Sequence, residues 1–143
     1  MSSYFFIGVA GVGMSAIGQY LVGRGVEVRG SDRQFGEYLA GNCEKPRVME
    51  QLEECGIKCF AQDGSGISAD LSAVVVSTAI EDTNPDLKRA KELGIPVMHR
   101  SEMLAKISKE AKTIAVSGTS GKSTVTAMIY HILQYAGLQP SVM

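Results

Sequence analysis

The sequence contains two glycine-rich segments whose residue types can bind phosphate groups. The first, residues 8–16 (GVAGVGMSA), contains Gly11-x-Gly13-x-x-Ala16 between an apolar run and an amphipathic segment. Glycines at these positions allow a tight turn and let the backbone approach a diphosphate, which N–H groups at the start of the following helix hold. Asp32 lies about 20 residues downstream, where an acidic side chain meets a ribose or a base. The pattern predicts diphosphate binding and leaves NAD and a UDP-sugar open as ligands.

The second segment, residues 118–124 (GTSGKST), resembles a Walker A motif, although Val116 stands at the position of its first glycine. Backbone amides of such a loop surround the phosphates, Lys122 reaches the β- and γ-oxygens, and the Ser123 hydroxyl binds Mg²⁺. An apolar run precedes the segment and an apolar-striped run follows it, which argues against a turn without a function. We predict that the residues binding nucleotide phosphate are Gly118, Thr119, Ser120, Gly121, Lys122, Ser123 and Thr124.

Apolar runs alternate with amphipathic segments up to Glu110. The runs predict strands at 4–7, 26–30, 57–60, 73–77 and 95–98. Helical spacing predicts helices at 14–24, 47–55 and 84–93, and a further helix that begins with Ser101 as its cap. Residues 34–46 are polar and contain glycine, which predicts a loop. The repeated alternation predicts an α/β protein with a Rossmann-like, doubly wound parallel sheet.

The pattern starts again at Thr113. It predicts a strand at 113–117, a loop at 118–121, a helix at 122–135 and the start of another strand at 141–143. We therefore expect a Rossmann-like domain over residues 1–110 and the beginning of a P-loop ATPase domain over residues 111–143.

The predicted helix at 122–135 and the residue after it carry an apolar stripe. Its members recur at helical spacing and are Val125, Met128, Ile129, Ile132 and Ala136. A bare stripe of this kind favours docking on the chain's own first domain or self-association with a second copy.

The composition is that of a globular protein and gives no electrostatic reason to expect nucleic acid or an anionic membrane as a partner. The chain has 143 residues with 14 Lys and Arg against 15 Asp and Glu, a formal charge of −1. Its apolar runs are far shorter than the roughly 20 residues that span a bilayer. No basic-then-apolar signal segment opens the chain, and Cys43, Cys55 and Cys59 match no zinc pattern. These features predict a cytoplasmic protein with reduced thiols.

Five segments, in order along the chain, resemble the Mur ligase family, and most closely its branch that joins L-alanine to UDP-N-acetylmuramate. They are residues 11–17 (GVGMSAI), 30–32 (GSD), 77–80 (STAI), 94–104 (GIPVMHRSEML) and the run into 118–122 (GTSGK). The murein-peptide ligases of cell-wall recycling share these segments, so the residues leave both branches open. The family usually carries His where Ser120 stands and Thr where Ser123 and Val125 stand, and serine keeps the metal-binding hydroxyl.

The resemblance implies a cytoplasmic, three-domain, ATP- and Mg²⁺-dependent ligase of peptidoglycan precursor synthesis. ATP would phosphorylate the substrate carboxylate, and the amine of L-alanine would attack the acyl phosphate. By this likeness Lys122 binds the ATP phosphates and Ser123 the magnesium ion. The residues that would bind UDP-N-acetylmuramate are Gly11, Val12, Gly13, Met14, Ser15, Asp32, Ser77, Thr78, His99 and Arg100.

The chain is short for such an enzyme, because the family needs a complete central domain and a third domain for the amino acid. We therefore expect an N-terminal fragment without catalytic residues or ligase activity of its own. Two further interpretations stay open at this point. One is the NAD(P)-binding domain of an oxidoreductase, which leaves residues 118–124 unexplained. The other is a regulatory nucleotide-binding module.

Overall fold

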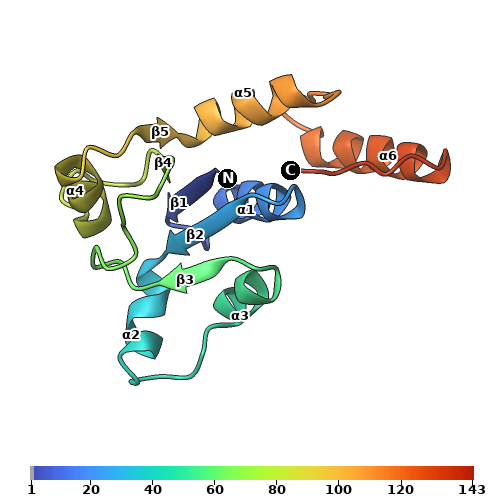
Figure 1. The fold of residues 1–143 in the computed structure, drawn as a ribbon. Helices are drawn as coiled ribbons and strands as arrows, with labels where there is room; N and C mark the ends of the chain where they lie inside the picture. The colour runs from blue at the N-terminus through green and yellow to red at the C-terminus, as the bar shows by residue number, and fades with distance from the viewer. Residues whose placement is uncertain (1) are drawn as a thin grey trace. The chain divides into compact units, whose positions relative to one another are not determined.

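The computed structural model describes residues 2–143 and contains a five-stranded parallel sheet (Figure 1). Every pair of neighbouring strands is parallel, and the order across the sheet is β3-β2-β1-β4-β5. The strands are β1 (Ser3–Ile7), β2 (Glu27–Ser31), β3 (Lys58–Phe60), β4 (Ala73–Val76) and β5 (Val97–His99). Because β2 and β4 lie on opposite sides of β1, the predicted doubly wound topology is confirmed.

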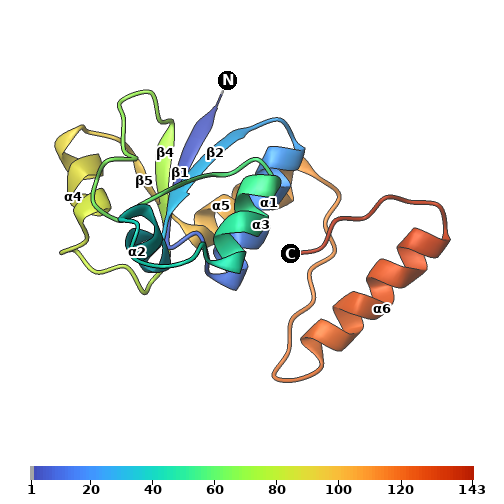
Figure 2. The same cartoon turned by 90° about the horizontal axis from the view of Figure 1, so that it is seen from below.

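Helices follow the strands as predicted, with a few changes of boundary. The elements are α1 (Val12–Gly23), the 3-10 helix η1 (Arg33–Phe35), α2 (Gly36–Leu39), α3 (Arg47–Glu54), α4 (Pro85–Glu92), α5 (Arg100–Glu110) and α6 (Lys122–Tyr135). Figure 2 shows α1 and α3 on one side of the strands and α4 on the other. A sheet covered on both faces requires apolar side chains pointing both ways.

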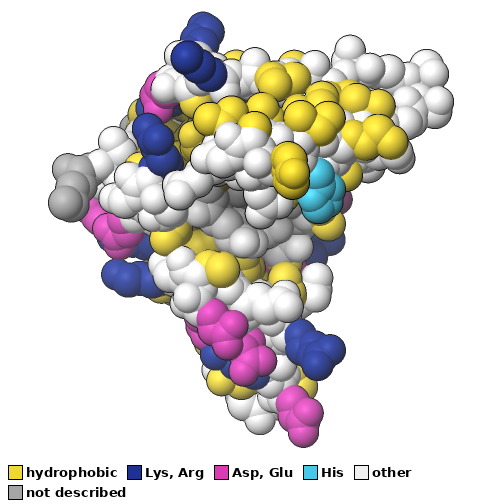
Figure 3. All heavy atoms as spheres, turned by 90° about the vertical axis from the view of Figure 1, so that its right-hand side faces the viewer, with side chains coloured by type: hydrophobic (Ala, Val, Ile, Leu, Met, Phe, Trp, Pro, Cys, Tyr) yellow, Lys and Arg dark blue, Asp and Glu magenta, His cyan; other side chains and the backbone are white. Residues whose placement is uncertain are grey.

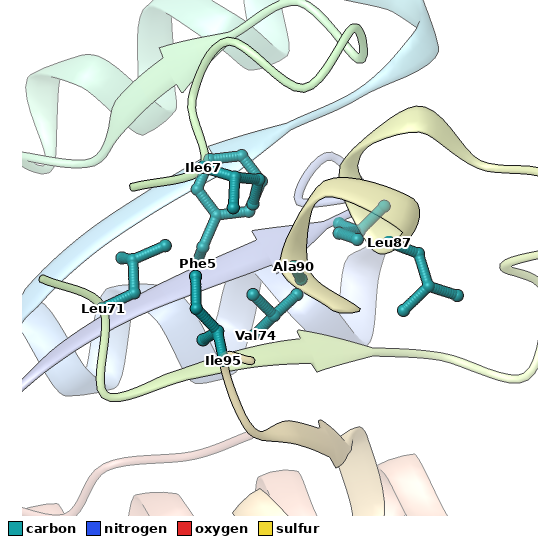
Figure 4. Close-up of a cluster of buried hydrophobic side chains, with 8 residues drawn as sticks. Phe5, Ile67, Leu71, Val74, Leu87, Ala90 and Ile95 are labelled. Carbon is teal, nitrogen blue, oxygen red and sulfur yellow. The ribbon is translucent and has the colours of Figure 1, made fainter. Parts of the chain in front are cut away.

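The central strand β1 meets this requirement, since all five of its residues are buried. Phe5 and Ile7 pack in a cluster with Val74 of β4 and with Leu87 and Ala90 of α4 (Figure 4). Tyr4 points the other way, and its hydroxyl accepts a 2.7 Å hydrogen bond from the Lys106 ammonium of α5.

A buried carboxylate at the start of α4 ties three segments together. Asp86 is fully buried and accepts hydrogen bonds from the Ser31 hydroxyl (2.5 Å) and from the Gly64 amide (2.6 Å). Asn84 caps the same helix by accepting from the Asp86 and Leu87 amides. Burial raises the pKa of the Asp86 carboxyl above its ordinary value, against the lowering effect of the two hydrogen bonds it accepts.

Two local predictions within residues 1–110 are wrong. The segment predicted as a loop at 34–46 begins with η1 and α2, because Asp32 caps η1 by accepting from the Gln34 amide and Phe35 is completely buried. The helix α5 begins at Arg100, so Ser101 lies in its first turn and is not its cap. The carboxylate of Glu102 accepts from the His99 amide just before the helix (3.0 Å).

The chain divides into two compact units after Lys106, and the second unit contains α6 at its predicted position. The assignment of residues 1–110 and 111–143 to two domains stays a prediction. The predicted strands at 113–117 and 141–143 are wrong, since neither segment is in a strand. A strand exists through its ladder of hydrogen bonds to a neighbour, and within residues 2–143 neither segment pairs with one.

No buried residue occurs on α6. The stripe residues Val125, Met128 and Ile132 are 44%, 59% and 67% exposed. Figure 3 shows hydrophobic side chains gathered in the upper part of its view. Among the described helices, none has both the length and the apolar character needed to cross a bilayer.

Replacing Asp86 with Asn should remove a pH-dependent loss of stability. The raised pKa means that the folded state binds this proton more tightly than the unfolded state. The contribution of Asp86 to the stability of wild type therefore falls as the pH rises from about 4 through the folded pKa of Asp86. Because an amide can donate to Ser31 and accept from Gly64, D86N keeps both contacts. We expect the free energy of unfolding of D86N, measured with urea and taken relative to that of wild type, to increase as the pH rises.

Asp82 provides the matched control. It is exposed, and the hydrogen bond from Lys91 lowers the pKa of its carboxyl. Its ionised form therefore stabilises the fold above its ordinary pKa, and D82N should lose stability relative to wild type as the pH rises. A D86N difference that does not change with pH would contradict the role assigned to the buried carboxyl.

Candidate functional site

A crevice opens where the sheet changes winding direction, between the carboxyl ends of β1 and β4. The glycine loop leaves β1 on one side, and residues 77–80 leave β4 on the other. Open parallel sheets bind ligands at this position. The crevice has a volume of about 390 Å³ and is lined by Gly8, Ala10, Gly11, Val12, Gly13, Met14, Asp32, Arg33, Gln34, Gln62, Ser77, Ala79, Ile80 and Arg100.

The first amides of the glycine loop are bonded within the protein. The Gly8 and Val9 N–H groups both donate to the Ser31 carbonyl at the end of β2 (2.8 and 3.0 Å). The Ala10 N–H donates to Asp32 Oδ2 (3.1 Å), and the Gly11 N–H donates back to Gly8 (3.1 Å). These four amides therefore hold the loop in shape and are not available to a ligand.

The amides that can face an anion come next, at the start of α1. Met14 and Ser15 donate to the Gly11 carbonyl as the first intrahelical bonds. Val12 and Gly13 precede that turn, and the first N–H groups of a helix have no carbonyl one turn before them. Their N–H groups lie at the positive end of the helix dipole, which favours a negative charge.

A cation lies next to Gly13. A Cβ built on Gly13 would overlap Arg100 Nη1, so the guanidinium occupies the space that a side chain at position 13 would fill. Arg100 is the first residue of α5 and lies directly after β5. A guanidinium beside two open amides can hold a diphosphate through charge-assisted hydrogen bonds.

Close approach of the backbone also explains Gly30. A Cβ at this position in β2 would lie 2.6 Å from Val9 Cβ and 2.9 Å from the Phe6 carbonyl oxygen. Only glycine leaves room for the loop to pass so near to β2, which is how Gly8 and Val9 reach the Ser31 carbonyl.

The structure brings together seven of the ten residues predicted to bind a UDP-sugar. Those lining the crevice are Gly11, Val12, Gly13, Met14, Asp32, Ser77 and Arg100. Met14 is 4% exposed, so it packs as well as lining the crevice. Ser15, Thr78 and His99 do not line it.

Each of these three has a different environment. The Ser15 hydroxyl donates to the Val12 carbonyl (3.0 Å), and Thr78 is exposed. His99 Nδ1 contacts the Ser101 hydroxyl (2.7 Å) and lies 3.3 Å from the Ser101 amide nitrogen. His99 Nε2 is buried and has no hydrogen-bond partner within the described part of the chain.

Sequence reasoning missed several crevice residues. These are Gly8, Ala10, Arg33, Gln34, Gln62, Ala79 and Ile80. All of them lie within a few residues of the carboxyl ends of β1 to β4. Once the strands were predicted, the rule that ligands bind beyond these ends could have found them.

The segment 118–124 leads into α6 in the second unit. Gly118 and Gly121 have positive φ values of 152° and 75°. The Lys122 ammonium donates to the Gly118 carbonyl (2.8 Å). The Val125 amide is bonded to the Gly121 carbonyl, so the amides of residues 122–124 precede the first intrahelical bond.

Only two of the seven predicted phosphate-binding residues, Lys122 and Ser123, line a cavity beside α6. Its volume is about 440 Å³, and it is lined by Val116, Lys122, Ser123, Thr126, Ala127, Tyr130, His131, Val142 and Met143. The Ser123 hydroxyl, the predicted Mg²⁺ ligand, is exposed here next to a lysine, an arrangement that fits a metal-bound nucleotide phosphate.

Other titratable groups serve the fold. The Asp70 carboxylate accepts from Ser68 and pairs with Arg29, and these bonds lower its pKa to about 2. Burial raises the pKa of the Cys59 thiol to about 12, which keeps it protonated and unreactive. In the part of the chain that the structure describes, no three His, Cys, Asp or Glu side chains are grouped so as to hold a metal ion.

A parallel sheet with a glycine loop and open helix amides at its switch point defines an α/β protein of the Rossmann-like class. The model of the Mur ligase family, catalytic domain, matches residues 3–112. The chain therefore belongs to the Mur ligase family.

Similar proteins include UDP-N-acetylmuramate–L-alanine ligases. The chain is 39% identical over 143 residues to the one from Carboxydothermus hydrogenoformans, covering 99% of this chain and 29% of the relative. It is 41% identical over 136 residues to the one from Paenarthrobacter aurescens, covering 95% and 28%. The chain thus spans less than a third of the length of these relatives.

Solved structures show the same fold. The UDP-N-acetylmuramate–alanine ligase of Thermotoga maritima matches with a TM-score of 0.77 and 29% identity, over 96% of this chain and 30% of that one. A murein peptide ligase from Psychrobacter arcticus matches with a TM-score of 0.79 over 96% of this chain and 27% of that one. Its identity of 24% supports a likeness of fold alone.

Removing the guanidinium should weaken anion binding in the crevice. We expect R100A to bind inorganic pyrophosphate about tenfold more weakly than wild type, the loss of one hydrogen bond to a charged group. G13A should cause a similar loss, because its methyl group displaces the guanidinium. In the R100A background G13A should change little. Calorimetric titration of the four proteins measures this coupling.

Arg89 supplies the control, since it is an exposed arginine paired with Glu92 outside the crevice. R89A should leave pyrophosphate binding unchanged. Equal losses in R89A and R100A would mean that net charge alone attracts the anion, and the site assignment would be wrong.

Proposed function

We propose that this chain is the nucleotide-sugar-binding part of an ATP-dependent carboxylate–amine ligase of peptidoglycan precursor synthesis. The observation that carries the proposal is the crevice at the switch point, where the Val12 and Gly13 amides and the Arg100 guanidinium converge. A diphosphate supplies the charge that this arrangement fits. The relatives that share its sequence are named for UDP-N-acetylmuramate and L-alanine, so UDP-N-acetylmuramate is the proposed ligand.

The residues of α6 and its preceding loop fit a second phosphate-bearing substrate, ATP. Lys122 would release the Gly118 carbonyl and bind the β- and γ-phosphates, while the amides of residues 122–124 hold their oxygens. The Ser123 hydroxyl would hold Mg²⁺, which supplies positive charge against the phosphate oxygens when bound.

The proposed reaction of the whole enzyme follows from the chemistry of carboxylates. A carboxylate is a poor electrophile, so its oxygen first attacks the γ-phosphorus of ATP, and ADP leaves. The amine of L-alanine then attacks the carbonyl carbon of the acyl phosphate, phosphate leaves with the bonding electrons, and the nitrogen loses a proton as the amide bond forms. This chain supplies binding groups for both substrates and, by this proposal, forms no amide bond alone, since it corresponds to less than a third of the relatives' length. The proposed location of this activity is the cytoplasm.

The alanine-adding branch is favoured over the murein-peptide branch. The relatives at 39% and 41% identity carry the alanine ligase name, whereas the peptide ligase structure at 24% identity shares the fold alone. An NAD(P)-binding domain of an oxidoreductase needs no second phosphate site, so it would not explain the cavity beside α6 that Lys122 and Ser123 line.

Separate titrations distinguish these functions. We expect UDP-N-acetylmuramate to stabilise the chain by about 2.7 kcal/mol at a concentration 100 times its dissociation constant, as linkage requires. NADH should give no stabilisation. Thermal unfolding with each ligand, and with ATP, measures the effect, and R100A is the control in which the UDP-sugar shift should shrink. Stabilisation by NADH and not by the UDP-sugar would disprove the proposal.

A further inference from the structure

We propose that the Asp32 carboxylate positions the glycine loop and does not bind the ribose of the ligand. The inference deepens the proposed function and rests on it for the identity of the ligand, UDP-N-acetylmuramate. It assigns an acidic residue of the crevice to the protein's own backbone.

The geometry of the carboxylate carries the assignment. Each oxygen accepts from one backbone amide, Oδ2 from Ala10 (3.1 Å) and Oδ1 from Gln34 (3.2 Å). The first bond joins the loop after β1 to the residue after β2, and the second caps η1. Asp32 thus holds two segments that both line the crevice.

The bond to Ala10 extends the pairing of β1 with β2 into the loop. Gly8 and Val9 already donate to the Ser31 carbonyl, so three consecutive amides are held by Ser31 and Asp32. The chain then turns at Gly11 and presents the Val12 and Gly13 amides at the start of α1. Removing the Asp32 carboxylate frees the third amide, and the open amides lose their fixed direction.

Electrostatics agree with this role. A free carboxylate in the crevice would repel a diphosphate, and this repulsion is strong when the charges lie a few ångströms apart. Two N–H dipoles directed at the Asp32 oxygens offset part of its charge. In dinucleotide-binding proteins the acid at this spacing accepts from a ribose hydroxyl instead.

The test compares ligands that differ only at the ribose. Dissociation constants of UDP, 2′-deoxy-UDP and 3′-deoxy-UDP are measured by calorimetry on wild type, D32N and D32S. Both substitutions keep one side-chain oxygen that can cap η1 by accepting from the Gln34 amide. Neither has a second oxygen to accept from the Ala10 amide. D82N, which removes an exposed charge paired with Lys91, is the matched control.

We expect D32N and D32S to bind UDP about tenfold more weakly, while D82N binds it as wild type does. The affinity ratio between UDP and each deoxy analogue should be the same in D32N as in wild type. A ratio that falls to one in D32N would show a ribose contact and overturn the proposal. Unchanged UDP affinity in both Asp32 variants would also overturn it.

A second measurement needs no ligand. Hydrogen exchange of the Ala10 amide, followed by NMR, should become at least about tenfold faster in D32N, since the bond that protects it is lost. Exchange at Phe5 and Phe6 in β1 should stay slow, which shows that the sheet is intact. Unchanged exchange at Ala10, or unfolding of both Asp32 variants, would overturn the positioning role. Failure of wild type to bind UDP would instead count against the proposed function.

Discussion

The end of strand β2 is the point on which the rest of the site depends. The Ser31 carbonyl accepts two consecutive amides of the glycine loop, and the Ser31 hydroxyl donates to the buried Asp86 carboxylate at the start of α4. One buried serine therefore connects β2, the loop after β1 and a helix from the opposite face of the sheet. Buried polar groups of this kind are costly unless each is paired, so the three segments hold one another in a single arrangement.

The crevice follows from that arrangement. Gly30 lets the loop pass close to β2, and the loop turns the start of α1 toward the gap beside β4. Arg100 comes from the far end of the chain's first unit and reaches the same place because β5 ends at the same edge of the sheet. Positive charge and open amides thus meet where the strand order reverses, and the chemistry that fits them is that of a diphosphate.

In the second unit, the source of the backbone hydrogen bonds decides which predicted elements form. Its helix α6 begins at Lys122 as the spacing of the sequence predicts, because hydrogen bonds within a helix satisfy its own backbone. The apolar segment at 113–117 has β-like composition but forms no strand, since the hydrogen bonds of a strand come from another strand. Local propensity is therefore sufficient for α6 and insufficient for residues 113–117.

The sequence by itself determined the strand–helix alternation, the parallel sheet and the two glycine loops, because apolar periodicity and glycine spacing are local signals. Only the tertiary structure decided which groups are available to a ligand. Asp32 stands at the spacing of a ribose-binding acid, yet its oxygens accept from Ala10 and Gln34. The crevice residues Gln34 and Gln62 had no motif to mark them. Hydrogen-bond partners and the lining of a crevice depend on contacts between segments far apart in the chain, which no local pattern encodes.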